Sequence, residues 1–226
     1  MESCKQISEA ETPSSEQAAR SADCPAAAGA FCRISHELKS HMPFTFFGAL
    51  TGIGILAVFV TADVPSGVST RLFWSLHPLH VLMSAVTTTA MFTLHSRRAV
   101  LATLVIGYVG SVGIGTLSDC LIPYVGEVLL DLPHRGIHLG FIEKWWLVNP
   151  LAVMGILAGY SWPRTKIAHA GHVLLSTWAS LFHMIMALGA DLPLATYVPI
   201  TVFLFLAVWI PCCTSDIVFP LLFAKK

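Results

Sequence analysis

Long apolar runs separated by short charged stretches constrain this chain more than any other feature of its sequence. A run of about 20 apolar residues has the length of a helix that crosses the hydrocarbon core of a bilayer. Inside that core every backbone N–H and C=O group needs a partner within the protein, so such runs form helices. We therefore predict an all-α, polytopic transmembrane helix bundle with about six spans, at about 44–62, 72–94, 99–118, 147–162, 167–190 and 195–223.

The composition agrees with a membrane domain. Only 12% of the 226 residues are charged, 55% are hydrophobic, and the mean hydropathy is +0.71. A soluble domain would carry about 25% charged residues. The 13 basic and 13 acidic residues cancel and form no basic stripe, so nucleic acid is not an expected partner. The expected partners are the lipid bilayer and a metal ion or other small-molecule substrate, and a homo-oligomer stays open.

The first 40 residues differ from the rest of the chain. Ser, Ala, Glu and Gln dominate residues 1–40, and no apolar period is present. Such a segment cannot bury enough apolar surface to fold, so we predict a disordered polar tail followed by one membrane domain at 41–226. The first apolar run begins about forty residues into the chain, which is not the pattern of a signal peptide.

Basic residues near the ends of the spans predict the orientation. With the N-terminus inside, eight of them fall on the inner side: Arg33, Lys39, Arg97, Arg98, Arg164, Lys166, Lys225 and Lys226. Three fall on the outer side: Arg71, Arg135 and Lys144. Cytoplasmic segments carry the excess of Lys and Arg. We therefore expect both termini in the cytoplasm, residues 125–145 outside, and the plasma (inner) membrane as location.

Three sequence blocks recur in the same order, which indicates an internal duplication. The two copies occupy about 43–124 and 147–223. The matching strings are PFTFFGALTG and PLAVMGILAG, HPLHVLMS and HAGHVLLS, and SDCLIP and SDIVFP. Each copy holds three spans, an odd number, so the copies must enter the membrane in opposite directions. This predicts two inverted three-helix repeats, an architecture found among secondary transporters.

Each copy carries two histidines three residues apart and an aspartate about one span later. Side chains three apart on a helix project from nearly one face. Two imidazoles and a carboxylate can chelate a divalent transition-metal ion. Ionisable groups inside membrane spans are costly and usually functional. The predicted metal ligands are His77, His80, Asp119, His169, His172 and Asp216.

The predicted topology places the two clusters near opposite faces, with the first toward the outside. If Pro123, Pro211 and Pro220 unwind their helices, both clusters lie deeper and approach each other. A structural alternative is that the histidines only bond backbone carbonyls or serines and hold helices together. Cys120, which follows Asp119, and Cys212 are weaker ligand candidates, because a buried cysteine is more often a packing residue.

These sites predict a transporter of a divalent transition-metal ion, zinc or iron, rather than an enzyme. Imidazole and carboxylate suit either ion better than calcium or magnesium, which prefer oxygen ligands. One alternative is a membrane-embedded metal-dependent hydrolase or oxidoreductase with an open metal position. Another is a b-type haem protein that transfers electrons, with His80 and His95 on one helix and His172 and His183 on another. No motif for a nucleotide or for a catalytic nucleophile is present.

Overall fold

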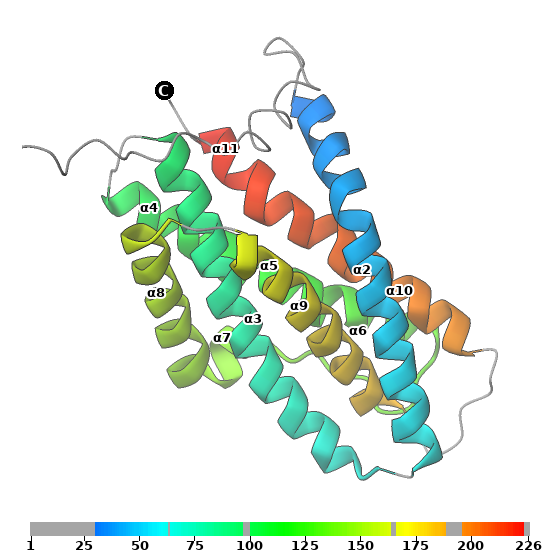
Figure 1. Ribbon diagram of the computed structural model, residues 1–226. Helices are drawn as coiled ribbons and strands as arrows, with labels where there is room; N and C mark the ends of the chain where they lie inside the picture. Colours follow the sequence, from blue (N-terminus) through cyan, green and yellow to red (C-terminus); the bar gives the residue numbers. More distant parts are fainter. Residues whose placement is uncertain (1–29, 63, 97–99, 164–165, 189–195, 224–226) are drawn as a thin grey trace, which may run out of the picture.

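The computed structural model describes residues 30–62, 64–96, 100–163, 166–188 and 196–223 (Figure 1). Within these ranges the side chains of residues 30–41, 44, 60, 66, 95, 166–170, 197, 213, 216 and 217 lie outside the description. The described part of the chain is helical and contains no strand. Its helices are α2 (Ala30–Thr61), α3 (Ser66–His95), α4 (Val100–Tyr108), α5 (Ile114–Thr116), α6 (Ile122–Leu129), α7 (Gly140–Glu143), α8 (Trp145–Ser161), α9 (Lys166–Ala187), α10 (Tyr197–Cys213) and α11 (Phe219–Phe223).

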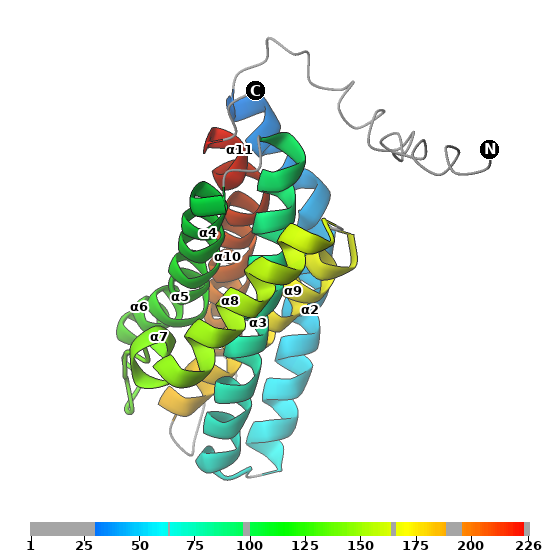
Figure 2. The same cartoon turned by 90° about the vertical axis from the view of Figure 1, so that its left-hand side faces the viewer.

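Each predicted apolar run coincides with a helix or a continuous series of helical turns. The first helix of the described residues, α2, begins at Ala30, ten residues before the predicted end of the polar tail, and it continues through Pro43. The third run was predicted to end at residue 118, which is wrong, because the helical path continues to Leu129. The fourth was predicted to begin at about residue 147, and the helix begins two residues earlier, at Trp145. The start of α2 and the end of α11 lie at the same end of the bundle (Figures 1 and 2).

Two π-helical turns explain why the third and sixth runs continue past their prolines. The turns are Leu117–Leu121 and Thr214–Val218, and they contain the matching aspartates. Pro123 and Pro220 each follow an aspartate by four residues. Proline has no N–H to donate to the carbonyl four residues earlier, and a widened turn before it is one way to accommodate the missing bond. The helix absorbs each proline in this way instead of ending there.

The two predicted repeat units pack against each other reciprocally. A β-carbon on Gly48 of α2 would lie 2.9 Å from Thr177 Oγ1 of α9. A β-carbon on Gly155 of α8 would lie 2.7 Å from Ala85 Cβ of α3. Gly48 and Gly155 match in the repeat, and Thr177 and Ala85 each lie eight residues after the first histidine of their HxxH pair. The first helix of each unit therefore rests on the histidine helix of the other unit.

Polar side chains are inside the bundle and large apolar side chains cover its surface. The buried polar residues include Ser84, Thr87, Thr88, Asp119, Glu127, Ser176, Ser180 and four histidines, His77, His80, His172 and His183. The exposed apolar residues include Phe46, Phe47, Leu101, Val105, Leu157, Trp162, Val198 and Leu222. Large apolar side chains are thus common on the described surface, whereas the buried positions carry many polar groups.

One helical path in the described residues, Val100–Leu129, is long and apolar enough to cross a membrane. Thr45–Phe59 and Val198–Cys212 are shorter apolar helices. The two histidine helices, α3 and α9, carry much of the buried polar set, which lowers their average hydropathy. The all-α fold is thus established, and the six-span membrane arrangement stays a prediction.

Candidate metal centre

His77 and His80 project from α3 toward one carboxylate. His77 Nδ1 lies 2.9 Å from Asp119 Oδ2, and His80 Nδ1 lies 2.6 Å from the same oxygen. All three side chains are buried. The spacing of three residues places both rings on one face of α3, and the π-helical turn around Asp119 brings the carboxylate opposite them.

The second oxygen of Asp119 is bound by two hydroxyl groups. Ser118 Oγ donates to Asp119 Oδ1 over 2.8 Å, and Ser176 Oγ of α9 donates to it over 2.9 Å. An ionised carboxylate has about four acceptor positions. Four donors therefore saturate Asp119. In this arrangement the carboxylate orients the imidazoles and has no unused lone pair to offer to an ion.

The hydrogen-bond network also assigns the histidine tautomers. Because Asp119 Oδ2 accepts from both rings, His77 and His80 each carry a proton on Nδ1. In a neutral imidazole the other nitrogen, Nε2, then carries the lone pair that binds metal. A carboxylate behind a histidine ligand is a recurrent outer partner in metal sites, where it fixes the ring and raises its basicity.

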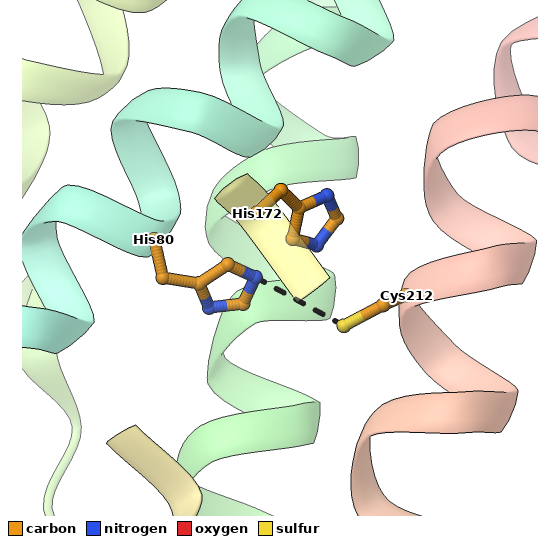
Figure 3. Close-up of side chains that lie close together, drawn as sticks. All are labelled: His80, His172 and Cys212. Carbon is orange, nitrogen blue, oxygen red and sulfur yellow. Dashed lines mark hydrogen bonds between the residues drawn. The ribbon is translucent and has the colours of Figure 1, made fainter. Parts of the chain in front are cut away.

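The Nε2 side of His80 faces His172 of α9 and Cys212 of α10 (Figure 3). His80 Nε2 lies 4.0 Å from Cys212 Sγ, and the His80 and His172 rings stack with centroids 4.6 Å apart. Cys212 Sγ donates to Ser176 Oγ over 3.2 Å. The potential ligand atoms of these three buried side chains lie within 4.8 Å of one another. Together they can hold a metal ion.

A second group of the same kind consists of His77, His80 and Asp119. The two groups share His80, so they form one continuous cluster with two alternative ligand sets. The set with Cys212 uses a lone pair on His80 that Asp119 leaves available. In the set with Asp119, the carboxylate must give up one of its four hydrogen bonds before it can bind the ion.

Gly115 of α5 lies against the His80 ring. A β-carbon at Gly115 would be 3.7 Å from His80 Cε1 and 3.2 Å from Val81 Cγ2. Gly115 and Cys212 are matching positions of the repeat, since each lies three residues before a Ser-Asp pair. One unit thus contributes a thiol at this position and the other contributes no side chain.

The far side of His77 is closed by a glycine and an aromatic ring. His77 Nε2 has no hydrogen-bond partner among the described residues. A β-carbon at Gly140, the first residue of α7, would contact Nε2 and would lie 2.6 Å from His77 Cδ2. The ring stacks on Phe73, with centroids 5.5 Å apart and planes 13° apart. The cluster is therefore enclosed on this side.

The structure brings four of the six predicted ligands together: His77, His80, Asp119 and His172. The side chains of His169 and Asp216, and that of the haem candidate His95, lie outside the described residues. The expectation that the two clusters sit near opposite faces is wrong for His80 and His172, whose rings are in contact. Their contact follows from the crossing of α3 and α9, which depends on long-range packing.

Sequence reasoning underrated Cys212 and did not propose Glu127 as a site residue. Glu127 lies in the segment 125–145 that was expected outside, but its side chain is buried and its Oε1 lies 2.7 Å from His183 Nδ1. The only available signal was the helical periodicity that places Asp119 and Glu127 on one face, eight residues apart.

Comparison with known proteins identifies no relative. No family model, no curated protein and no solved structure matches this chain. The function must therefore be argued from the geometry of the cluster and from the arrangement of the helices around it.

Proposed function

We propose that this protein is a multi-pass membrane carrier for a divalent transition-metal ion, with zinc or ferrous iron as cargo. The observation that carries the proposal is the buried cluster of His80, His172 and Cys212, to which both repeat units contribute. Asp119 holds the His80 ring with its Nε2 turned toward the other two side chains. Both termini are proposed to be cytoplasmic.

The distribution of side chains supports a bilayer location. Apolar side chains on the outside and hydroxyl, imidazole and carboxylate groups on the inside suit a bundle surrounded by lipid. The 30 residues of α3 correspond to about 45 Å of helix, which exceeds the roughly 30 Å hydrocarbon core. Among the described residues, the apolar path Val100–Leu129 also has the length of a membrane span.

The reciprocal glycine contacts support an inverted repeat. If a two-fold axis in the membrane plane relates the units, His80 and His172 are each other's counterparts. Their stacked rings would then lie close to that axis. A site between two inverted units is where alternating-access carriers bind their cargo, since motion of one unit against the other opens it to either side.

The ligand types favour zinc, followed by ferrous iron. Two imidazoles and a thiolate are nitrogen and sulfur donors, which both ions accept and which calcium and magnesium do not. The carboxylate of Asp119 contributes a negative charge 2.6 Å from the His80 ring, which stabilises a cation bound on the other side of that ring. A buried charge of this kind is costly without compensation.

A metal-dependent enzyme is the second candidate, because three protein ligands with an open fourth position also describe catalytic zinc sites. Haem is less suitable, since axial ligands lie on opposite faces of the macrocycle and the His80 and His172 rings are stacked directly on each other.

The test is zinc uptake by proteoliposomes that contain the purified protein. We expect zinc accumulation down an imposed gradient, and loss of both uptake and zinc binding in His80→Ala and Cys212→Ser. The matched control is His134→Ala, which removes an exposed imidazole of the connecting loop and should leave uptake unchanged. Zinc binding without uptake would reject the carrier and favour the enzyme. Absence of zinc binding would leave the cluster with a structural role only.

A further inference from the structure

A buried pair of titratable side chains lies outside the central cluster. Glu127 of α6 and His183 of α9 are in contact, with His183 Nδ1 2.7 Å from Glu127 Oε1. Both side chains are essentially inaccessible to solvent. A buried pair of this kind rarely stabilises a protein by more than apolar residues of the same volume would. Titratable groups inside an apolar bundle are costly, and the binding of protons is one of the functions that retain them.

The hydrogen bonds of the pair show where a further proton can bind. An ionised carboxylate only accepts, so His183 donates its Nδ1–H to Glu127 Oε1. Glu127 Oε2 accepts the backbone N–H of Gly136 over 3.2 Å. His183 Nε2 is buried and has no hydrogen-bond partner among the described residues. In a neutral imidazole this nitrogen carries the lone pair, so it is the atom to which one proton can add.

A proton at this nitrogen changes the net charge of the pair. With a neutral His183, the ionised Glu127 gives the pair one negative charge. With a protonated His183, the imidazolium and the carboxylate cancel each other at a separation of 2.7 Å. The pair therefore has two states that differ by one proton, and histidine is the side chain whose charge changes most readily near neutral pH.

The elements around the pair carry other titratable side chains, but none of these is bonded to Glu127 or His183 in the described part of the chain. In α3, the π-helical turn before α6, α6 and the segment 130–144 these are Arg71, His77, Asp119, Cys120, Tyr124, Asp131, His134, Arg135, His138, Glu143 and Lys144. The described side chains of α2 include no titratable group, and those of α10 include only Cys212 of the central cluster. Asp131 and Arg135 form their own exposed ion pair at 3.2 Å. His183 is therefore the group that can balance the charge of Glu127.

The connection between α6 and α7 links the pair to solvent. The His138 ring lies edge-to-face against the His183 ring, with centroids 5.4 Å apart. His138 is partly exposed, and its Nδ1 lies 3.3 Å from Oε2 of the partly exposed Glu143. A group that exchanges protons with water thus lies against the ring that holds the unpartnered nitrogen.

One aromatic ring separates the pair from the central cluster. The buried Phe73 ring lies edge-to-face against His183, with centroids 5.2 Å apart, and it stacks on His77, with centroids 5.5 Å apart. Across this apolar ring, water screens charges only weakly, so a proton on His183 and an ion in the central cluster repel each other. Each therefore lowers the affinity for the other by the same factor.

We propose that Glu127 and His183 form a proton-binding site that exchanges one proton for the divalent ion of the central cluster. The proton leaves His183 Nε2 for solvent when an ion binds, and a proton from solvent returns to the same nitrogen when the ion departs. This inference rests on the proposed carrier function and adds that zinc or ferrous iron moves in exchange for protons. In the conformation that the structure shows, His138 connects this site to solvent.

The first measurement is the number of protons that the purified full-length protein releases when it binds zinc, followed with a pH indicator in weak buffer. Zinc displaces the thiol proton of Cys212 in every variant that keeps this cysteine, because the thiolate binds metal. We expect two protons per zinc ion in the wild type, one of them from the pair. Glu127→Gln, which keeps the shape of the side chain, and His183→Gln should each bind zinc and release one proton. His134→Ala, which removes an exposed imidazole of the same connection, is the matched control and should release two.

The second measurement is nitrogen NMR of protein labelled with ¹⁵N at its histidines, which reads the protonation of each ring directly. The His183 signal is the one that is missing from His183→Gln. At mildly acidic pH we expect His183 Nε2 to be protonated in the zinc-free wild type and unprotonated after zinc is added. In Glu127→Gln it should be unprotonated in both samples, because no carboxylate balances an imidazolium. Elution as a single species in gel filtration verifies that each variant is folded.

The outcomes separate the proton site from the carrier. Equal proton release by the wild type and Glu127→Gln, or a His183 Nε2 that stays in one protonation state, overturns the proton site. Zinc uptake by proteoliposomes in that case leaves the carrier standing without this coupling. Displacement of the His183 proton by zinc without any zinc uptake rejects the carrier and leaves the proton site standing.

Discussion

Replacement of Gly140 by Ala should displace His77 and weaken zinc binding. A β-carbon at Gly140 would contact His77 Nε2 and lie 2.6 Å from His77 Cδ2, whereas ordinary contacts begin at 3.4 Å. The ring must therefore move by at least about 0.8 Å. Gly140 does not adopt a positive φ, so alanine adds no backbone strain and the effect comes from this contact alone.

The magnitude follows from the surroundings of the ring. His77 is buried and stacked on Phe73, so it has little room to move away from Gly140. Overpacking of a well-packed interior costs about 1–3 kcal/mol. A shift of the ring also lengthens its 2.9 Å hydrogen bond to Asp119, and bonds to a charged group contribute about 1.5–3 kcal/mol. We expect a loss of stability of about 2–4 kcal/mol.

The assay combines unfolding in mixed micelles with zinc titration. Gly140→Ala should unfold at lower denaturant concentration and bind zinc at least tenfold more weakly, which corresponds to about 1.4 kcal/mol. The matched control is Gly54→Ala, since a β-carbon there meets no atom within 4 Å. Wild-type stability and zinc affinity in Gly140→Ala would refute the close approach of α7 to His77 and the contribution of His77 to the site.

Three further predictions concern packing, the carboxylate and the orientation. Gly155→Ala should destabilise the protein by about 1–3 kcal/mol, because the new β-carbon would lie 2.7 Å from Ala85 Cβ and would contact the Leu82 carbonyl. Denaturant unfolding of this variant, compared with that of Gly54→Ala, measures the loss of stability. Ser176→Ala should cost about 1.5–3 kcal/mol by the same assay, since one of four donors to buried Asp119 is lost. The variant Arg135→Cys should react with a membrane-impermeant maleimide that is added outside intact cells. Labelling of this variant only in permeabilised cells would reverse the proposed topology.

The sequence predicted the parts of this fold that depend on local pattern. The length of the apolar runs was sufficient to locate the helices, and the recurrence of HxxH with Asp was sufficient to pair His77 and His80 with Asp119. Both signals are carried by neighbouring residues along one helix, where spacing determines direction. The prediction that the third run ends at residue 118 failed, because the π-helical turn Leu117–Leu121 lets the helical path continue past Pro123.

The rest of the site depends on contacts between distant segments. Cys212 lies 132 residues after His80, and His183 lies 56 residues after Glu127. No local pattern specifies such distances, because they follow from how the helices cross. The neighbours of a cysteine in an apolar segment also do not distinguish a packing residue from a metal ligand.

The glycine at position 115 has a consequence for how long an ion can stay. The repeat pairs Gly115 with Cys212, so a strictly symmetric protein would surround its ion with four side chains, two imidazoles and two thiols. Four such ligands make the closed zinc sites that hold their ion permanently and stabilise folds. With hydrogen in place of the second thiol, the coordination number provided by these side chains stops at three. In the proposed carrier, this one departure from the predicted repeat would separate a site that exchanges its ion from a site that keeps it.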